Sequence, residues 1–226
     1  MISAHQLRFR YPRSDFELDL PELEINKNER VAVVGPSGCG KTTLLNLLSG
    51  IALPDSGQVT VNGIEISSLS DAARRNFRIA NIGMVFQQFE LVEYLDLKAN
   101  ILLPFYINQS LKLCRETEQR AESLAQEMGL GNKLKRRPSQ LSQGEQQRCA
   151  ICRALITQPT IILADEPTGN LDPKNKQLIL ELVHQQVEKH QMTLIVVTHD
   201  MSLLDQMDRT IDFETMRVEA PAGDSS

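Results

Sequence analysis

At the start of the chain, hydrophobic residues recur with the period of a β-strand. Residues 1 to about 30 alternate apolar and polar positions, with turns expected at residues 12–15 and 26–28. Apolar runs at residues 57–61 and 82–86 continue the β framework, and Asn62-Gly63 between them is typical of a hairpin turn. We therefore expect an antiparallel sheet in the first part of the chain.

The middle of the chain has a helical period instead. Between about residues 88 and 157, an amphipathic pattern over residues 114–128 ends at Gly129, and residues 146–155 carry a second one. We expect these residues to form a helical subdomain, 88–157.

Strands and helices then alternate in the last part of the chain. Apolar runs at residues 161–164 and 194–197 flank a helical pattern over about residues 174–189. This alternation predicts an α/β core with a parallel sheet. We expect residues 1–87 and 158–226 to form that core within a single domain, with a short polar tail after Glu219.

A glycine-rich segment, GPSGCGKTT, lies between the apolar run 31–34 and a helical stretch expected at residues 43–49 that Gly50 closes. It matches the pattern GxxxxGK[ST], in which glycines let backbone N–H groups turn inward around a polyanion. Lys41 is expected to reach the β- and γ-phosphates of a nucleotide, and the Thr42 hydroxyl to bind Mg²⁺. The segment predicts a nucleotide-binding loop of Gly35, Pro36, Ser37, Gly38, Cys39, Gly40, Lys41, Thr42 and Thr43.

Two carboxylates follow the apolar run that begins at Ile161. A buried strand here delivers Asp165 and Glu166 at its carboxyl end, where α/β sheets bind their ligands. Neighbouring residues on a strand point to opposite sides, so we expect different roles for the two. Asp165 would hold Mg²⁺, and Glu166 would polarise the water that attacks the γ-phosphate.

A third motif, Leu-Ser-Gln-Gly-Glu at residues 141–145, opens a helical pattern that runs to residue 155. Ser142 occupies a natural capping position. A serine hydroxyl and the Gly144 N–H at a helix N-terminus make a second anion site, which the chain's own nucleotide does not need. The simplest use for this site is the γ-phosphate held by a neighbouring subunit.

These motifs, in this order, resemble those of the nucleotide-binding subunit of an ATP-binding cassette (ABC) system, over nearly the whole chain. LSQGEQQR is similar to the LSGGQ signature, with Gln143 and Glu145 as its two departures. VFQQF matches the Q-loop at Gln87, residues 169–172 match the D-loop, and VVTHD matches the switch histidine at His199. The resemblance implies a RecA-like P-loop NTPase fold with an antiparallel β subdomain and an inserted helical subdomain.

The resemblance also implies roles for single residues. Tyr11 would stack on the adenine, or else be a strand-end tyrosine packed at the surface. Gln87 would contact Mg²⁺ or the lytic water, and His199 would hold the γ-phosphate together with Glu166. Asp172 would lie at the subunit interface. The other histidines, His5, His184 and His190, are expected to be structural or solvated.

A pair of cassettes that closes around two ATP molecules and drives an integral membrane subunit is the function that this resemblance implies. EPTGNLD and VFQQFEL are similar to the branch with lipoprotein-release, macrolide-efflux and cell-division ATPases (LolD, MacB and FtsE). An importer ATPase, a P-loop ATPase without a membrane partner and a phosphotransferase remain alternatives. The partner would contact a groove that includes Phe89, Leu91, Tyr94 and Leu95, unless these are ordinary core residues.

Composition agrees with a single globular ATPase. The chain has 226 residues, 41% of them hydrophobic, and a net charge of −5 that argues against nucleic acid as a partner. Two basic clusters, Arg74-Arg75 with Arg78 and residues 135–137, are expected on solvated faces, or else facing anionic lipid headgroups if the protein docks at a membrane. The sequence has neither an apolar run long enough to span a membrane nor a leader pattern, so we expect a cytoplasmic protein held at the membrane by its partner.

The four cysteines agree with a reducing compartment. Cys149 and Cys152 have the CxxC spacing of redox and metal sites, but the chain has no second pair to complete a zinc site. Their spacing of three residues places both on one apolar helix face, so we expect them in the core.

Overall fold

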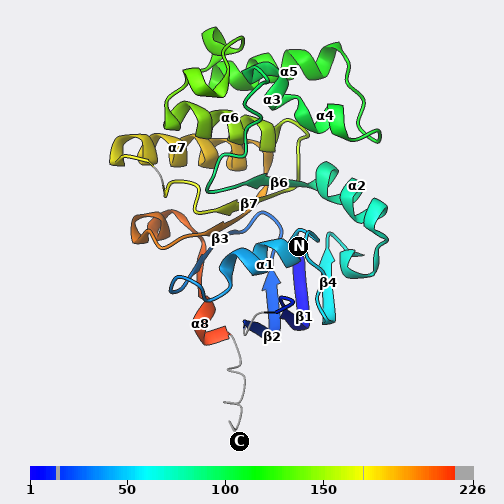
Figure 1. Ribbon diagram of the computed structural model, residues 1–226. Coiled ribbons are helices and arrows are strands. Elements are labelled where there is room, and N and C mark those ends of the chain that lie inside the picture. The colour runs from blue at the N-terminus through cyan, green and yellow to red at the C-terminus, as the bar shows by residue number, and fades with distance from the viewer. Residues whose placement is uncertain (14–15, 170, 217–226) are drawn as a thin grey trace, which may run out of the picture.

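A computed structural model describes residues 1–13, 16–169 and 171–216 and places a helical layer, a parallel sheet and an antiparallel sheet above one another (Figure 1). Part of the turn expected at residues 12–15, Asn170 of the D-loop and the polar tail lie outside the described residues. Within the described part, no helix combines the length and the apolar character that crossing a membrane requires.

The antiparallel sheet confirms the strand period at the start of the chain. Its strand order is β2-β1-β4-β5. The strands are β1 (Ile2–Arg10), β2 (Glu17–Ile25), β4 (Ser56–Val61) and β5 (Ile64–Glu65). The predicted hairpin turn joins β4 to β5, with φ of 50° at Asn62 and 79° at Gly63, as a two-residue turn of this sequence requires.

The second sheet has the order β6-β7-β8-β3-β9, and every neighbouring pair is parallel. Its strands are β3 (Arg30–Val34), β6 (Ile82–Val85), β7 (Ile161–Asp165), β8 (Thr193–Val197) and β9 (Arg209–Asp212). All five residues of β8 are buried, as expected for a central strand covered on both faces. Parallel strands end at one edge of the sheet, so the segments after β3, β7 and β8 meet there.

Each face of the parallel sheet packs against a different layer. Helix α1 (Lys41–Leu48) lies between the two sheets, where its leucines join Leu163 and Ile195 in one hydrophobic cluster. The opposite face packs against the helices, and there Ile162 and Ala164 join the second cluster. Alternate residues of β7 thus belong to the two clusters, as the period of a strand dictates.

The helices of the second cluster include those predicted from the helical period. They are α3 (Leu97–Ile101), α4 (Leu103–Ile107), α5 (Arg115–Glu127), α6 (Gln143–Leu155) and α7 (Pro173–His190). Helix α6 begins three residues before the expected start, because the cap at Ser142 starts the helix at Gln143. The division of the chain into a core and a helical subdomain stays a prediction.

Cys149 and Cys152 are both buried on α6 and free, which confirms the core interpretation. Burial raises the pKa of the Cys149 thiol to about 12 and that of Cys152 well above its ordinary value. Neither thiol is therefore ionised at neutral pH, and the pair is unsuited to redox chemistry or metal binding.

Helix α2 (Asp71–Asn81) was not predicted, and it corrects one expectation about the basic clusters. Arg74 is buried, and it donates hydrogen bonds of 2.9 Å from Nε to the Gly50 carbonyl and from Nη1 to the Leu69 carbonyl. Arg78 Nη1 also donates to Gly50, at 3.1 Å. The expectation of a solvated face is wrong for Arg74. The Gly50 carbonyl, which follows α1, requires a hydrogen-bond donor, and the Arg74 side chain supplies it.

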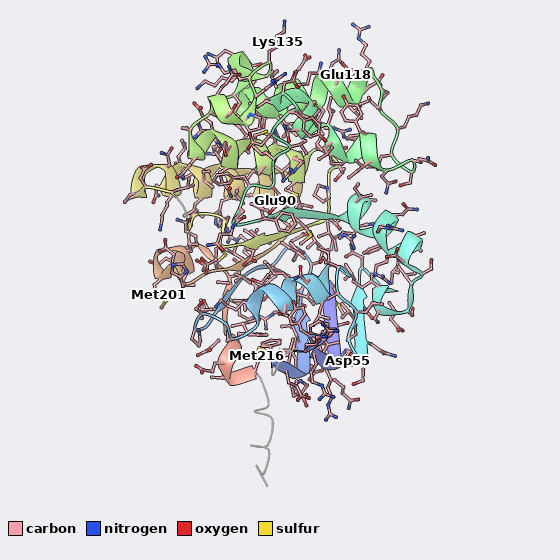
Figure 2. All side chains as sticks on the ribbon, in the orientation of Figure 1. Asp55, Glu90, Glu118, Lys135, Met201 and Met216 are labelled. Atoms are coloured by element: carbon pink, nitrogen blue, oxygen red, sulfur yellow. The ribbon has the colours of Figure 1, made fainter. Side chains whose placement is uncertain are left out.

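The other basic cluster agrees with the expectation. Lys135, Arg136 and Arg137 are exposed. Figure 2 shows Lys135 at the outer end of the helical layer, far from the edge where the parallel strands end.

Candidate nucleotide-binding site

The phosphate loop follows β3 at the carboxyl edge of the parallel sheet and leads directly into α1. Gly40 ends the loop with φ of 108°, in the region that favours glycine, and α1 begins at Lys41 instead of the expected Thr43. A Cβ at Gly40 would lie 2.6 Å from Phe16 Cζ, so a side chain at this position would displace the Phe16 ring. The loop therefore requires glycine for its backbone conformation.

Lys41 is buried, and its ammonium group lies against the loop itself. Nζ donates hydrogen bonds of 2.8 Å to the carbonyls of Gly35 and Pro36, and lies 3.8 Å from Cys39 Sγ. These bonds hold the cation over the loop at the position where a phosphate chain would enter.

Thr42 and Asp165 contact each other at the same edge, although 123 residues separate them. The Thr42 hydroxyl donates a hydrogen bond of 2.8 Å to Asp165 Oδ2. Burial raises the pKa of the Asp165 carboxyl, the Thr42 hydrogen bond opposes that shift, and the charge of Glu166 adds to it. A hydroxyl beside a half-buried carboxylate is a donor set that suits Mg²⁺.

Glu166 lies directly beyond β7 and approaches His199, which follows β8. Its φ is 43°, a left-handed conformation that costs free energy in a glutamate and that surrounding contacts must hold. Its backbone N–H donates to the Val197 carbonyl at 2.9 Å, and its Oε1 lies 2.9 Å from His199 Nδ1. Strain of this kind is common where a side chain must face a ligand.

These side chains surround a cavity of about 390 Å³. Its lining residues are Tyr11, Phe16, Ser37, Gly38, Gly40, Lys41, Thr42, Thr43, Gln87, Asp165, Glu166 and Val197. The structure thus brings together most of the residues that sequence reasoning selected, while His199 contacts the group through Glu166. Their roles remain predictions.

Two aromatic residues form one wall of this cavity. Tyr11 lies 3.3 Å from the Thr43 hydroxyl through its Oη and contacts Phe16, with ring centroids 5.9 Å apart. Sequence reasoning missed Phe16, which reaches the cavity from the residue before β2. No local pattern could have identified it, because its position depends on the pairing of β1 with β2.

The signature motif does not line the cavity. Ser142 caps α6, accepting a hydrogen bond of 3.3 Å from the Glu145 N–H, and Glu145 Oε2 accepts one of 3.0 Å from the Ser142 N–H. Glu145 also pairs with Lys133, and this contact lowers the pKa of the Glu145 carboxyl. Ser142 is exposed at the N-terminus of α6, where anions bind readily.

Gln147 was also missed, and it joins the signature helix to the segment after Glu166. Its Nε2 donates a hydrogen bond of 2.7 Å to the carbonyl of Pro167, and the side chain is fully buried. Gln147 is polar, so the spacing of apolar residues along the helix does not predict that its side chain is buried. The contact links the start of α6 to the carboxyl edge of the sheet.

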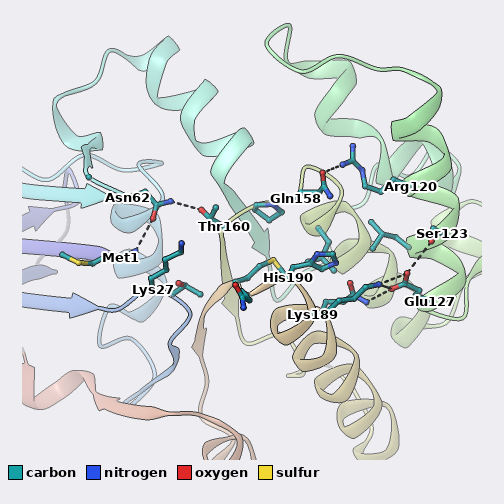
Figure 3. Close-up of a pocket in the computed structure, with 18 of the residues that line it drawn as sticks. Met1, Lys27, Asn62, Arg120, Ser123, Glu127, Gln158, Thr160, Lys189 and His190 are labelled. Atoms are coloured by element: carbon teal, nitrogen blue, oxygen red, sulfur yellow. Dashed lines mark hydrogen bonds and ion pairs between the residues drawn. The ribbon is translucent and has the colours of Figure 1, made fainter.

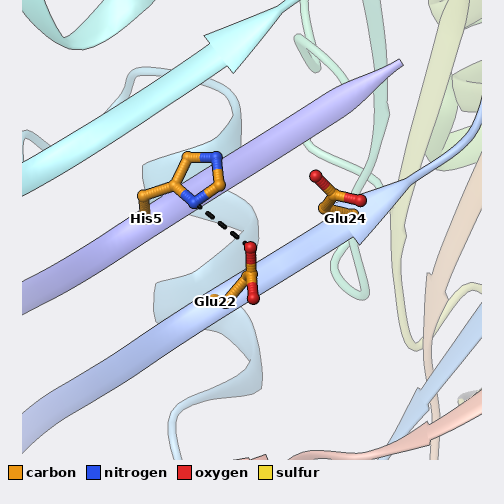
Figure 4. Close-up of side chains that lie close together, drawn as sticks. All are labelled: His5, Glu22 and Glu24. Carbon is orange, nitrogen blue, oxygen red and sulfur yellow. Dashed lines mark ion pairs between the residues drawn. The ribbon is translucent and has the colours of Figure 1, made fainter.

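The remaining histidines lie away from the cavity. His5 lies on β1, its side chain is 47% exposed, and its Nδ1 is 3.5 Å from Glu22 Oε1, with Glu24 nearby (Figure 4). This exposed pair agrees with a solvated histidine. His184 on α7 is half-buried, and burial lowers its pKa.

Comparisons with known proteins agree with the geometry of the cavity. Residues 18–169 match the family described as ABC transporter. The chain is 42% identical over 207 residues to the lipoprotein-releasing system ATP-binding protein LolD of Pseudomonas syringae pv. tomato, covering 92% of this chain and 90% of the relative. It is also 42% identical to the macrolide export ATP-binding/permease protein MacB of Rhodopirellula baltica, covering 93% of this chain and 31% of the relative.

A solved structure is similar over almost the same length. It is the dimeric structure of a post-hydrolysis state of an ATP-binding cassette bound to ADP and Pi. The TM-score is 0.84 at 34% sequence identity, with 94% of both chains covered. This likeness confirms the expected α/β fold with its added β and helical layers.

Proposed function

Because this chain belongs to the ABC transporter family and is an ATPase of that family, we propose that two copies close around ATP and drive an integral membrane partner. The observation that carries this proposal is the separation, in one chain, of the two groups of residues that we predict to bind the phosphates. Lys41, Thr42 and Glu166 surround one cavity, whereas Ser142 and Gly144 lie outside it at the start of α6. A second copy can place its own Ser142 and Gly144 against the cavity of the first copy.

Nucleotide binding is assigned to the loop and its neighbours. The ammonium group of Lys41 exchanges its bonds to two loop carbonyls for the β- and γ-phosphates, which carry full negative charge. Thr42, Asp165 and Gln87 would hold Mg²⁺, which supplies positive charge to the phosphate oxygens when it is bound. The ring of Tyr11, at the cavity wall, stacks on the adenine.

Hydrolysis is assigned to Glu166. Its carboxylate accepts a proton from the attacking water and orients that water toward the γ-phosphate. His199 holds the Glu166 side chain through its Nδ1, and its other ring nitrogen would donate to the transferred phosphoryl group. In this division of roles, Asp165 binds the metal ion and Glu166 orients the attacking water.

Pairing of two copies follows from the position of the signature. Ser142 is exposed, and its hydroxyl and the N–H groups at the start of α6 donate to the γ-phosphate that the other copy holds. Asp172, the capping residue of α7, lies near Gly144 through Asn175 and belongs to the same surface. Loss of the γ-phosphate removes the shared ligand, and the two copies separate.

The membrane partner is proposed from the relatives. LolD is named as part of a lipoprotein-releasing system, and MacB is named as an ATP-binding/permease protein, of which this chain covers 31%. We assign a cytoplasmic helix of such a permease to a groove of about 380 Å³ where α2, β6 and α4 meet. This partner would hold the chain at the cytoplasmic face of the membrane.

The sequence predicted a partner groove that includes Phe89, Leu91, Tyr94 and Leu95, and none of these four residues lines the groove proposed here. Tyr94 is 77% exposed and therefore available to the partner. Leu91 packs against the helical hydrophobic cluster, as a core residue does. The walls of the groove instead include Ile51, Met84 and Ile107, of which Ile107 is 69% exposed.

Two measurements test this function. Phosphate release should rise more steeply than linearly with protein concentration, and a concentration-independent rate in a species shown to be monomeric would contradict the pairing. A tagged protein purified from detergent-extracted membranes should retain a permease subunit, and Ile107→Asp should release it. Retention by the variant would contradict the groove, and the absence of any permease would favour an ATPase without a membrane partner.

A further inference from the structure

A larger cavity, of about 1080 Å³, opens at the opposite edge of the parallel sheet, where β7 and β8 begin (Figure 3). Its walls come from the N-terminal residue, the β4–β5 hairpin, α5, and the ends of α6 and α7. The nucleotide cavity lies at the carboxyl ends of the same strands. This second cavity is therefore separate from the ATPase site, and nothing in the proposed function uses it.

The floor of the cavity is apolar. Leu124 of α5, Leu155 of α6 and Met192 before β8 are each at most 7% exposed and line it together with Pro159. The volume slightly exceeds the usual range of ligand pockets, which is about 300–1,000 Å³. A molecule with an apolar body is favoured in such a space, because it displaces water from these side chains.

The rim of the cavity is positively charged. It carries Lys27, Arg120 and Lys189, against a single carboxylate, Glu127, among the described residues that line it. Glu127 is already paired, with its Oε2 3.2 Å from Lys189 Nζ. In the described part of the chain, Lys27 forms no ion pair. This concentration of cations stands out in a protein whose net charge is −5.

Two buried polar atoms at the cavity also have no partner within the described residues. Gln186 is 95% buried, and its Nε2 donates to Glu127 at 2.7 Å while its Oε1 accepts no hydrogen bond. Arg120 bonds Gln158 through Nη1, but its Nε has no acceptor. Buried polar atoms without partners are rare, and both belong to residues that line the cavity, while the atoms themselves are closed off from its space.

From these contacts we propose that the cavity binds a small anionic amphiphile, with its apolar body on Leu124, Leu155 and Met192. Its carboxylate or phosphate group accepts hydrogen bonds from Lys27 or from Arg120, which lie on opposite walls of the cavity (Figure 3). A nucleotide fits less well, because the described lining has no phenylalanine, tyrosine or tryptophan on which a base could stack. The proposal goes beyond the ATPase function and does not depend on it.

The ligand would contact two parts of the structure at once. Arg120, Leu124 and Glu127 lie on α5, whereas Met1 and Lys27 belong to the side of the antiparallel sheet (Figure 3). In the figure, the only drawn hydrogen bond that crosses from the sheet side joins Asn62 to Thr160, which precedes β7. A bound amphiphile would therefore connect α5 with the sheet side.

Binding of dodecanoate, dodecyl phosphate and the uncharged dodecanol to the full chain tests the proposal, by calorimetry below their critical micelle concentrations. We expect one saturable site for at least one anion and at least tenfold weaker binding of dodecanol. Lys27→Ala or Arg120→Met, whichever cation holds the headgroup, should weaken anion binding about 3- to 10-fold, with little change for dodecanol. Unchanged anion binding in both variants would contradict the charged contact. The two anions distinguish a carboxylate ligand from a phosphate ligand.

A blocking variant and its control complete the experiment. Ser123→Trp on α5 places a large side chain in the cavity and should abolish binding, whereas Gln126→Trp, on an exposed part of the same helix outside the cavity, should bind normally. Retained ATP binding shows that each variant is folded. Equal binding of dodecanol and the anions, binding that survives Ser123→Trp, or binding of none of the probes would overturn the proposal.

Discussion

His199 Nδ1 lies 2.9 Å from Glu166 Oε1, and the two residues follow neighbouring strands of the parallel sheet. Because β7 and β8 are neighbouring parallel strands, the short segments that follow them lie next to each other. The pair is held in place by the bond from the Glu166 N–H to Val197, which leaves the carboxylate directed into the nucleotide cavity.

Glu166→Gln should reduce turnover by about 10²- to 10⁴-fold, because an amide cannot accept the proton of the attacking water. The amide has the same shape and can keep a contact with His199, so ATP binding should persist. An ATP-bound dimer should therefore accumulate, measured by size-exclusion chromatography with light scattering. Glu181→Gln, on the exposed part of α7, is the matched control. Normal turnover in Glu166→Gln would remove this residue from its assigned role.

Lys41→Ala should weaken ATP binding by about 10- to 100-fold, because it removes a charged donor to the phosphates. It also leaves the carbonyls of Gly35 and Pro36 without the donor they have now. Titration with a fluorescent ATP analogue measures the change, and Lys112→Ala, at an exposed lysine elsewhere, should bind normally. Unchanged affinity in Lys41→Ala would show that the phosphates do not use this ammonium group.

Much of this site could be predicted because its residues lie in short segments whose chemistry is local. Around Lys41, the order of apolar strand, glycine-rich loop and helix predicts the phosphate loop. At Asp165, a buried strand that ends in two carboxylates predicts the acidic part of the site. Phe16 and Gln147 could not be predicted, since their positions depend on strand pairing and on the packing of α6 against the loop after β7. Arg74 was misjudged for the same reason: its acceptors, the Gly50 and Leu69 carbonyls, lie outside its own helix.

Gly144 offers a test of pairing between copies. A Cβ at this position would lie 2.9 Å from Asn175 Oδ1 in the same chain, so Gly144→Ala alone mixes an internal clash with any effect on a partner. We therefore compare Gly144→Ala with Gly144→Ala/Asn175→Ala, which removes the internal clash. ATP binding by the monomer should be normal in both, because Gly144 lies outside the cavity.

If Gly144 approaches the γ-phosphate of the other copy, the double variant should still fail to form the ATP-bound dimer in a Glu166→Gln background. Asn175→Ala alone is the control and should form the dimer. Full recovery of the dimer in the double variant would mean that the position matters only for packing within one chain.

The ion pair between Lys133 and Glu145 gives the last prediction, on stability. Glu145 stands where the signature consensus has glutamine, and its carboxylate also accepts the Ser142 N–H at 3.0 Å. The Lys133 contact is the main cause that lowers the pKa of Glu145, with burial opposing it. A carboxyl with a lowered pKa in the folded state stabilises the protein above its unfolded pKa, and that contribution is lost as the pH falls through the folded pKa.

Glu145→Gln and Lys133→Met should each lower the free energy of unfolding at pH 7 by about 1 kcal/mol, with a coupling of about 0.5–1.5 kcal/mol in the double-mutant cycle. Urea unfolding measures both values. The difference between Glu145→Gln and the unchanged protein should shrink as the pH falls below the ordinary pKa of a glutamate, and should be lost once the pH has passed through the lowered pKa of Glu145 in the folded state. The more exposed pair Lys189–Glu127 is the control, with a coupling below about 1 kcal/mol. A coupling near zero for Lys133 and Glu145, or a difference independent of pH, would show that the pair does not stabilise the start of α6.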